Sequence, residues 1–220
     1  MELRKPATAN PKCGNPMVVR PSERNIPERT RPGQPRPTMH AEGVYTVEMA
    51  EGSFVKANPE ALVFRPLELP GDGPLAVQFS EDAFVCSFGN AERFWAEAGR
   101  DGRRWVDRLG EKLLQDPRNA VNAWLRGTLV GQVVLGSSDT EPNVGHVNLY
   151  YLVPQWRGRG FASQLDGYAV AVLRDQGYRI ATLNVSPTNM RAIRFYLRYG
   201  WYELGPRPDA PFVHAMARVL

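Results

Sequence analysis

A glycine-rich turn sits between an apolar strand pattern and an amphipathic helix pattern, and it constrains the fold more than any other feature. Residues 157–160 read Arg-Gly-Arg-Gly, strand-like residues 146–153 precede them, and a helix pattern runs from Phe161 to Gly177. The first backbone N–H groups of a helix have no partner within the helix and lie at the positive end of its dipole. Because glycine lets a ligand approach the backbone closely, this turn predicts a phosphate-binding site.

The residues of the turn exclude two familiar kinds of nucleotide site. No Gly-Lys-Ser/Thr follows it, which excludes a Walker loop, and it lacks the third glycine of a dinucleotide-binding fingerprint. A tight strand-to-helix turn that merely needs glycine is the alternative that stays open. Arg157 and Arg159 favour the binding site, because an ordinary turn gains nothing from positive charge at the positive end of a helix.

The order of hydrophobic patterns predicts one mixed α/β domain without internal repeats. Extended pieces are expected at 44–49, 61–67 and 75–79, and a strand at 82–88, followed by helices at 91–98 and 105–113. A hairpin of 119–125 and 128–135 comes next, turning at Arg126-Gly127, and strand 146–153 leads into the glycine turn. After the helix at 161–177 we expect a strand at 179–185, a helix from Asn189 to Gly200, and strands at 201–204 and 212–218.

Residues 1–40 differ in composition from the rest of the chain. They contain 8 of the 19 prolines, no Trp, Tyr or Phe, and a net charge of +5. Such a segment has little to bury, so it predicts a flexible basic arm before a single domain at 41–220 with its core at 82–220. A translation start at Met39 is an alternative that the sequence leaves open.

The net charge of +4 and the pI of about 9.2 would favour a nucleic-acid or membrane partner if the charge were uniform along the chain. It is not, because residues 41–150 carry −6 and residues 151–220 carry +5. Nucleic acid is therefore not the expected partner, and without a run of about 18 apolar residues no membrane span is expected. Two cysteines, Cys13 and Cys86, form no disulfide framework, which favours a cytoplasmic location.

Two motifs then carry a resemblance to a known family. Residues 152–162, with Arg157, Gly160 and Ala162 at the spacing Arg/Gln-x-x-Gly-x-Gly/Ala, resemble the acetyl-CoA-binding signature of the GNAT superfamily of N-acetyltransferases. Asn189, followed seven residues later by Tyr196, is similar to the superfamily's later helix. The element order over 82–220 fits as well, and the resemblance implies a mostly antiparallel sheet flanked by helices, the GNAT-like acyl-CoA N-acyltransferase fold.

The resemblance implies a role for each matching position. The backbone of the turn would hold the CoA pyrophosphate, with charge from its arginines; these residues are Arg157, Gly158, Arg159, Gly160, Phe161, Ala162 and Ser163. The strand end Tyr151, Leu152 and Val153 would pair with the pantetheine arm, and an amide near Leu152 would polarise the thioester carbonyl. Asn189 would contact the pantetheine region. Tyr196 would protonate the departing thiolate, unless it is a core aromatic residue.

The general base is not evident. Some superfamily members carry a Glu five residues before the cap asparagine, where this chain has Asn184. An amine of pKa near 10 must lose a proton before it attacks, which costs roughly three decades of rate at neutral pH. His146, a carboxylate of residues 41–150 or a water chain are the candidates, and a structural role for His146 stays open.

These observations predict transfer of an acetyl group from acetyl-CoA directly to a primary amine. The charge of −6 in the acceptor portion favours a cationic acceptor, although those acids would equally serve to solvate two helices. The alternatives are a non-catalytic acyl-CoA sensor and a nucleic-acid binder that uses the basic arm. His40, His146 and His214 are scattered, so no metal site is expected. Similar proteins are often dimers, and a homodimer stays open.

Overall fold

The computed structural model describes residues 37–39, 45–47, 61–138, 141 and 143–220. The chain divides into a unit at Met1–Pro32, which lies outside the described residues, and a unit at Gly33–Leu220, which holds every described element. The arm expected at residues 1–40 therefore lies outside the described part, except that residues 37–39 form a short strand.

A single sheet of nine strands organises the second unit, in the order β1-β2-β3-β4-β5-β6-β7-β9-β8. The strands are β1 (Pro37–Met39), β2 (Tyr45–Val47), β3 (Val63–Pro66), β4 (Ala120–Leu125), β5 (Thr128–Ser137), β6 (Val144–Leu152), β7 (Ile180–Val185), β8 (Tyr202–Arg207) and β9 (Ala210–Val219). Neighbouring strands are antiparallel throughout, except for the parallel pair β6 and β7. The predicted mixed α/β fold with a mostly antiparallel sheet is confirmed.

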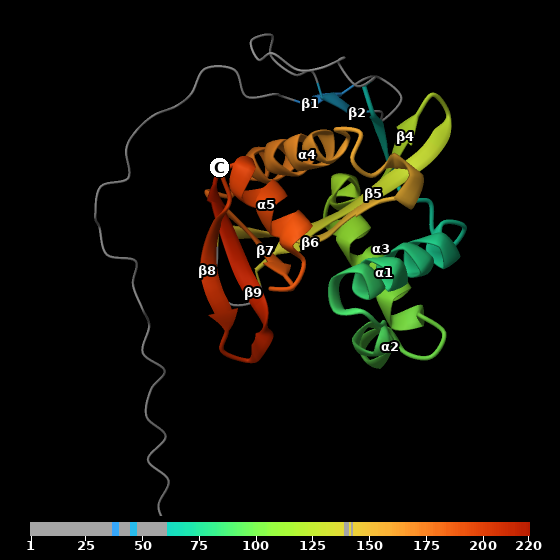
Figure 1. The fold of residues 1–220 in the computed structure, drawn as a ribbon. Helices are drawn as coiled ribbons and strands as arrows, with labels where there is room; N and C mark the ends of the chain where they lie inside the picture. Colours follow the sequence, from blue (N-terminus) through green and yellow to red (C-terminus); the bar gives the residue numbers. More distant parts are fainter. Residues whose placement is uncertain (1–36, 40–44, 48–60, 139–140, 142) are drawn as a thin grey trace, which may run out of the picture. The chain divides into compact units, whose positions relative to one another are not determined.

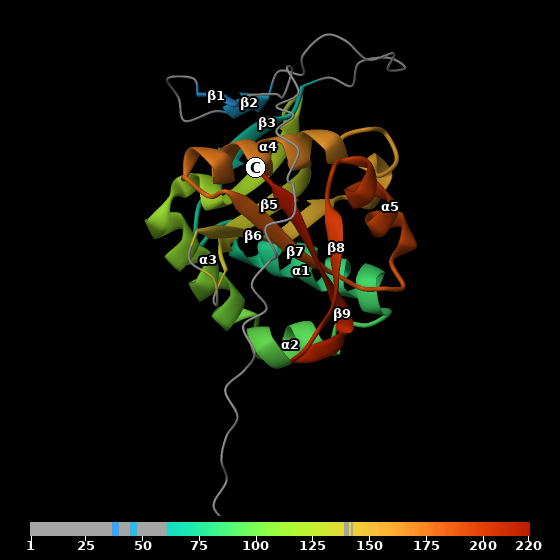
Figure 2. The ribbon, with the colours of Figure 1, turned by 90° about the vertical axis from the view of Figure 1, so that its left-hand side faces the viewer.

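Helices cover both faces of this sheet (Figures 1 and 2). They are α1 (Gly73–Phe88), α2 (Glu92–Ala98), α3 (Arg103–Gln115), α4 (Ala162–Asp175) and α5 (Met190–Arg198), with short 3₁₀ turns at Pro117–Asn119 and Pro154–Trp156. One core cluster joins α4 and α5 to one face of the sheet, and a second joins α1 and α3 to the other. A third, smaller cluster packs α2 against α1 and α3.

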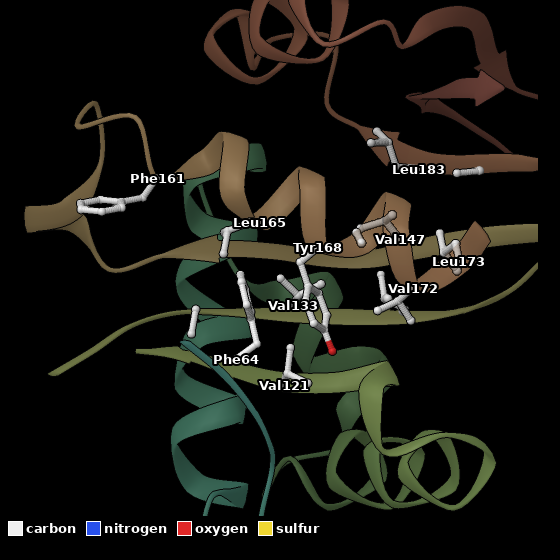
Figure 3. Close-up of a cluster of buried hydrophobic side chains, with 14 of the residues drawn as sticks. Phe64, Val121, Val133, Val147, Phe161, Leu165, Tyr168, Val172, Leu173 and Leu183 are labelled. Carbon is white, nitrogen blue, oxygen red and sulfur yellow. The ribbon is translucent and has the colours of Figure 1, made fainter. Parts of the chain in front are cut away.

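The helix that follows the glycine turn is held firmly against the sheet. The side chains of Leu165, Tyr168 and Val172 point from α4 into the core, where Tyr168 stacks on Phe64 with ring centroids 4.2 Å apart (Figure 3). The Tyr168 hydroxyl donates to the Arg118 carbonyl at 3.0 Å, so its polar atom has a partner inside the core. Burial of each apolar side chain of this kind contributes about 1.5–3 kcal/mol, which holds α4 against the sheet.

The hairpin predicted at Arg126-Gly127 is confirmed. Both residues have positive φ angles, +49° and +78°, which is the backbone geometry of the tight turn that matches the twist of two antiparallel strands. The helices predicted near 91–98, 105–113, 161–177 and 189–200 correspond to α2, α3, α4 and α5. Of the piece expected at 44–49, the structure describes residues 45–47, which form β2.

The extended piece expected at 75–79 and the strand expected at 82–88 are wrong, because both segments belong to the single helix α1. Ala76, Phe79 and Ser80 are buried against the sheet at helical spacing, while Val77 and Phe84 pack on the opposite side against α2. A helix buried on two sides carries apolar residues all round, so a short window of it resembles a strand.

Among the described residues, no helix combines the length and the apolar character that a membrane span requires.

Candidate active site

The glycine turn has the backbone geometry that an anion site requires. Gly158 and Gly160 adopt φ angles of +80° and +92°, which side chains with a Cβ rarely tolerate. The N–H groups of Gly158, Gly160, Phe161 and Ala162 donate to no acceptor in the described part of the chain. Phe161, 5% exposed, anchors the turn by packing edge-on against Trp156 at 5.7 Å. The turn thus presents several unpaired N–H groups at the N-terminus of α4.

The parallel strands β6 and β7 separate beside this turn. Their pairing ends at Val147 and Leu183, although β6 continues to Leu152 and β7 to Val185. The outer edge of each strand stays paired, with β5 and β9 respectively. The pairing of β6 with β5 also shifts here: Val134 pairs with Leu149 and Leu135 with Val147, so β6 bulges at Asn148 where the separation begins. Beyond Val147 and Leu183 the facing edges of β6 and β7 are not paired with each other, which leaves an opening in the sheet between them.

The amide of Leu152 faces this opening. Successive N–H groups of a strand point to opposite edges, and the N–H of Val153 donates to the Val130 carbonyl on the β5 side at 2.9 Å. The N–H of Leu152 consequently points to the β7 side. The Leu152 carbonyl accepts a hydrogen bond from Arg157 Nε at 2.7 Å.

Arg157 links the turn to β6 and to α1. Its Nη2 donates to Asp82 Oδ2 at 2.5 Å, its Nη1 lies 3.1 Å from Cys86 Sγ, and its guanidinium lies 5.4 Å from the Tyr151 ring centroid. Burial together with the Asp82 carboxylate raises the pKa of Tyr151 above its usual range. The charge of Arg157 is thus engaged by the protein, whereas Arg159 stacks over Trp156 at 5.1 Å.

Sequence reasoning missed Asp82 and Cys86. They are four residues apart on one face of α1, and a helical interpretation of 73–88 would have placed them together.

Asn189 caps α5, as its position predicted. Its Oδ1 accepts a hydrogen bond from the Ala192 N–H at 3.2 Å, and its own N–H donates to the Ser186 carbonyl at 3.0 Å. The side-chain oxygen of Asn189 therefore orients the first turn of the helix that carries Tyr196.

Tyr196 lies beside the open part of β6. Its ring centroid is 6.2 Å from that of Tyr150 on β6 and 6.0 Å from that of Trp201. Burial and, second, the negative charge of Asp166 raise the pKa of Tyr196 above its usual range. The phenol therefore keeps its proton at neutral pH.

The structure does not bring His146 to this opening. His146 lies in the paired part of β6, opposite Thr182 on β7, and its Nδ1 is 2.9 Å from Thr182 Oγ1. At about 3.3 Å per residue, roughly 20 Å of strand separates it from Leu152. Its role as a base stays a prediction. In the described part of the chain, no three His, Cys, Asp or Glu side chains form a group that could hold a metal ion.

Comparisons with known proteins agree on the fold and the family. The profile of the Acetyltransferase (GNAT) family matches residues 83–201, more than half of the chain. No curated protein sequence matches. Among solved structures, the PaiA N-acetyltransferase of Thermoplasma acidophilum in complex with coenzyme A aligns with a TM-score of 0.59 and 14% identity, covering 72% of this chain and 99% of the other.

Two further structures show the same fold. The ribosomal-protein-alanine N-acetyltransferase of Brucella melitensis aligns with a TM-score of 0.56 and 18% identity, over 71% of this chain and 99% of the other. The spermidine N-acetyltransferase of Vibrio cholerae, in complex with CoA and spermine, aligns with a TM-score of 0.55 and 16% identity, over 72% and 95%. With the glycine turn, the open strand pair and the profile match in agreement, the chain belongs to the GNAT acetyltransferase family.

Proposed function

We propose that this protein transfers the acetyl group of acetyl-CoA directly to a primary amine, without an acetyl-enzyme intermediate. The observation that carries the proposal is the opening between β6 and β7 beside the unpaired N–H groups of the glycine turn. An extended thioester that carries a pyrophosphate needs an unpaired strand edge for its arm and, next to it, an anion site for its phosphates. The CoA complexes of the Thermoplasma and Vibrio enzymes support CoA as the acyl carrier.

In this proposal the turn binds the pyrophosphate and the strand edges bind the pantetheine arm. The N–H groups of residues 158–162 donate to phosphate oxygens at the positive end of α4, with Arg159 adding charge. Arg157 holds the turn against β6 and α1, which fixes the distance from the phosphate site to the opening.

The reaction forms a C–N bond and breaks a C–S bond. The amine nitrogen attacks the thioester carbon, and the Leu152 N–H donates to the carbonyl oxygen as negative charge develops there. When the C–S bond breaks, the sulfur takes the phenolic proton of Tyr196, and the proton lost by the amine passes to water. Tyr196 then regains a proton from solvent.

We propose a cationic acceptor. Its support is the net charge of −6 over residues 41–150. The helices α1, α2 and α3 themselves are nearly balanced, with six acidic and five basic side chains. A panel of spermidine, a free amino acid, a peptide with a free N-terminus and a lysine peptide with a blocked N-terminus separates the acceptor classes by CoA release.

Substitution of Tyr196 tests the mechanism. Tyr196→Phe should lower kcat about 10- to 1,000-fold because the thiolate then leaves without a proton donor, while the Kd of CoA stays within about threefold. Tyr202→Phe is the matched control, because Tyr202 is 44% exposed on β8. Tight CoA binding with no turnover on any amine would instead indicate a sensor. Binding of nucleic acid that weakens steeply with rising salt would instead indicate a nucleic-acid binder that uses the basic arm.

A further inference from the structure

Asp166 is an unexpected residue on the inner face of α4. It lies between core residues Leu165 and Tyr168 and is 2% exposed. Among the described residues, no other Asp, Glu, Lys, Arg or His is buried to this degree. A buried ion pair is often no better for stability than apolar side chains of the same volume. The presence of a carboxylate here therefore calls for a role other than packing.

Two strands and the segment between α5 and β8 supply the partners of this carboxylate. Arg218 on β9 donates to Oδ2 at 2.6 Å, and the Trp201 indole N–H donates to Oδ1 at 2.8 Å. The Tyr150 hydroxyl on β6 lies 3.4 Å from the same Oδ1. Asp166 thus joins α4, the strand edge at the opening, and the residues that follow α5.

Two of these partners are the aromatic rings that flank Tyr196. Trp201 packs edge-on against the Tyr196 ring, and the Tyr150 ring lies tilted to it with the centroids 6.2 Å apart. The backbone N–H of Trp201 also donates to the Tyr196 carbonyl at 3.0 Å, which ties Trp201 to the end of α5. The orientation of Tyr196 is consequently set by residues that Asp166 holds.

We propose that Asp166 is a positioning residue for Tyr196, which it holds at the opening between β6 and β7 through Trp201 and Tyr150. The inference rests on the proposed function, in which Tyr196 protonates the departing thiolate. Arg218 forms an ion pair with Asp166, so the carboxylate that accepts these two hydrogen bonds is not an isolated buried charge. Asp166 itself exchanges no proton with the substrate.

The test separates positioning from stability with two variants. Asp166→Asn leaves Arg218 without its charge partner, whereas the double variant Asp166→Leu/Arg218→Met replaces the whole pair with apolar side chains and is expected to keep the fold. Asp166→Asn keeps one acceptor oxygen for Trp201 and Tyr150 but loses the charge, whereas the double variant removes both acceptor oxygens. Asp175→Asn on the same helix is the matched control, because the Asp175 side chain is 64% exposed.

The measurement uses the best amine of the panel as the acceptor and compares kcat with two different acetyl donors. With acetyl-CoA, both Asp166 variants should lower kcat about 10- to 100-fold, with the Kd of CoA within about threefold. With p-nitrophenyl acetate the change should stay below about threefold, since that leaving group is stable as an anion and needs no proton. A variant that merely loosens the fold would slow both donors.

Tyr196→Phe distinguishes failure of this inference from failure of the proposed function. If Tyr196→Phe slows acetyl-CoA turnover, the Asp166 substitutions should add little to it, because both act on one step. Full additivity, or unchanged kcat in the folded double variant, would overturn the positioning role alone. If Tyr196→Phe leaves turnover with acetyl-CoA unchanged, the general-acid role itself is wrong.

Discussion

At the scale of single residues, Arg157 shows why a motif position does not define a contact. Its place in the turn predicted that its positive charge would help to bind the pyrophosphate. In the structure its side chain donates hydrogen bonds to Leu152, Asp82 and Cys86. Nothing in the local sequence pairs positions 82 and 157, because only the packing of α1 against the end of β6 brings them together. The phosphate role of Arg157 stays a prediction, and its linking role is open to measurement.

A double-mutant cycle measures the link between Arg157 and Asp82. Arg157→Lys cannot reproduce several donors in one plane, so we expect a loss of about 1 kcal/mol in the free energy of unfolding. Asp82→Asn should cost a similar amount, and the combination should be less than additive. Chemical denaturation of the four proteins gives the coupling energy. Strict additivity would show that the two side chains do not interact in solution.

Gly131 is required for the close approach of β5 to β6. A Cβ at this position would collide with the Tyr151 carbonyl, a backbone atom that cannot turn aside. Gly131→Ala should therefore push β6 away at the open part, lowering stability by about 1–3 kcal/mol and weakening CoA binding. Gly110→Ala on α3 is the control, because a Cβ at Gly110 would meet only Leu69 Cδ1, at an ordinary contact distance of 3.9 Å. The control should be neutral or stabilising by about 0.5–1 kcal/mol. Equal thermal stability of the two variants would contradict the collision.

At the scale of elements, the sequence is a good guide where one pattern dominates. The hairpin at 126–127, the cap at Asn189 and the turn before α4 each depend on local backbone chemistry, and the structure has them where they were predicted. Helix α1 has a misleading pattern because it is buried on two sides. The separation of β6 from β7 could not be predicted, since it depends on how far a strand pair stays in register, which no local pattern records.

The junction between α3 and β4 depends on Asp116. Burial alone would raise the pKa of Asp116, but hydrogen bonds from Arg118 and Gln176 outweigh it and lower the pKa to about 2. Because the folded-state value lies below the ordinary 3.8, the stabilisation is complete above about pH 4 and disappears as the pH falls through 2.

Asp116→Asn tests that dependence. At pH 7 the variant should lose about 2 kcal/mol of unfolding free energy, and the difference from the parent protein should shrink between about pH 4 and 2. Denaturation at several pH values gives the curve. A difference that stays constant down to about pH 2 would rule out the carboxylate as its source.

At the scale of the whole molecule, the net charge and the residues of the candidate site are unevenly distributed along the chain. The strands and helices after residue 143 carry the glycine turn, the open edges and Tyr196, in a region whose net charge is positive. Helix α1, which precedes β4, supplies Asp82 and Cys86, and both contact Arg157 of that region. The overall net charge of +4 obscures this division, and the pI taken alone would have favoured nucleic acid as a partner.

The most direct test of direct transfer follows the acetyl group itself. The protein is mixed with acetyl-CoA and the amine panel, the reaction is quenched over time, and mass spectrometry measures free CoA, acetylated amine and intact protein together. Direct transfer predicts one acetylated amine for each CoA released, with no acetylated protein at any time point. CoA that binds but yields no acetylated amine, or an acetyl group that accumulates on the protein before it reaches the amine, would contradict it.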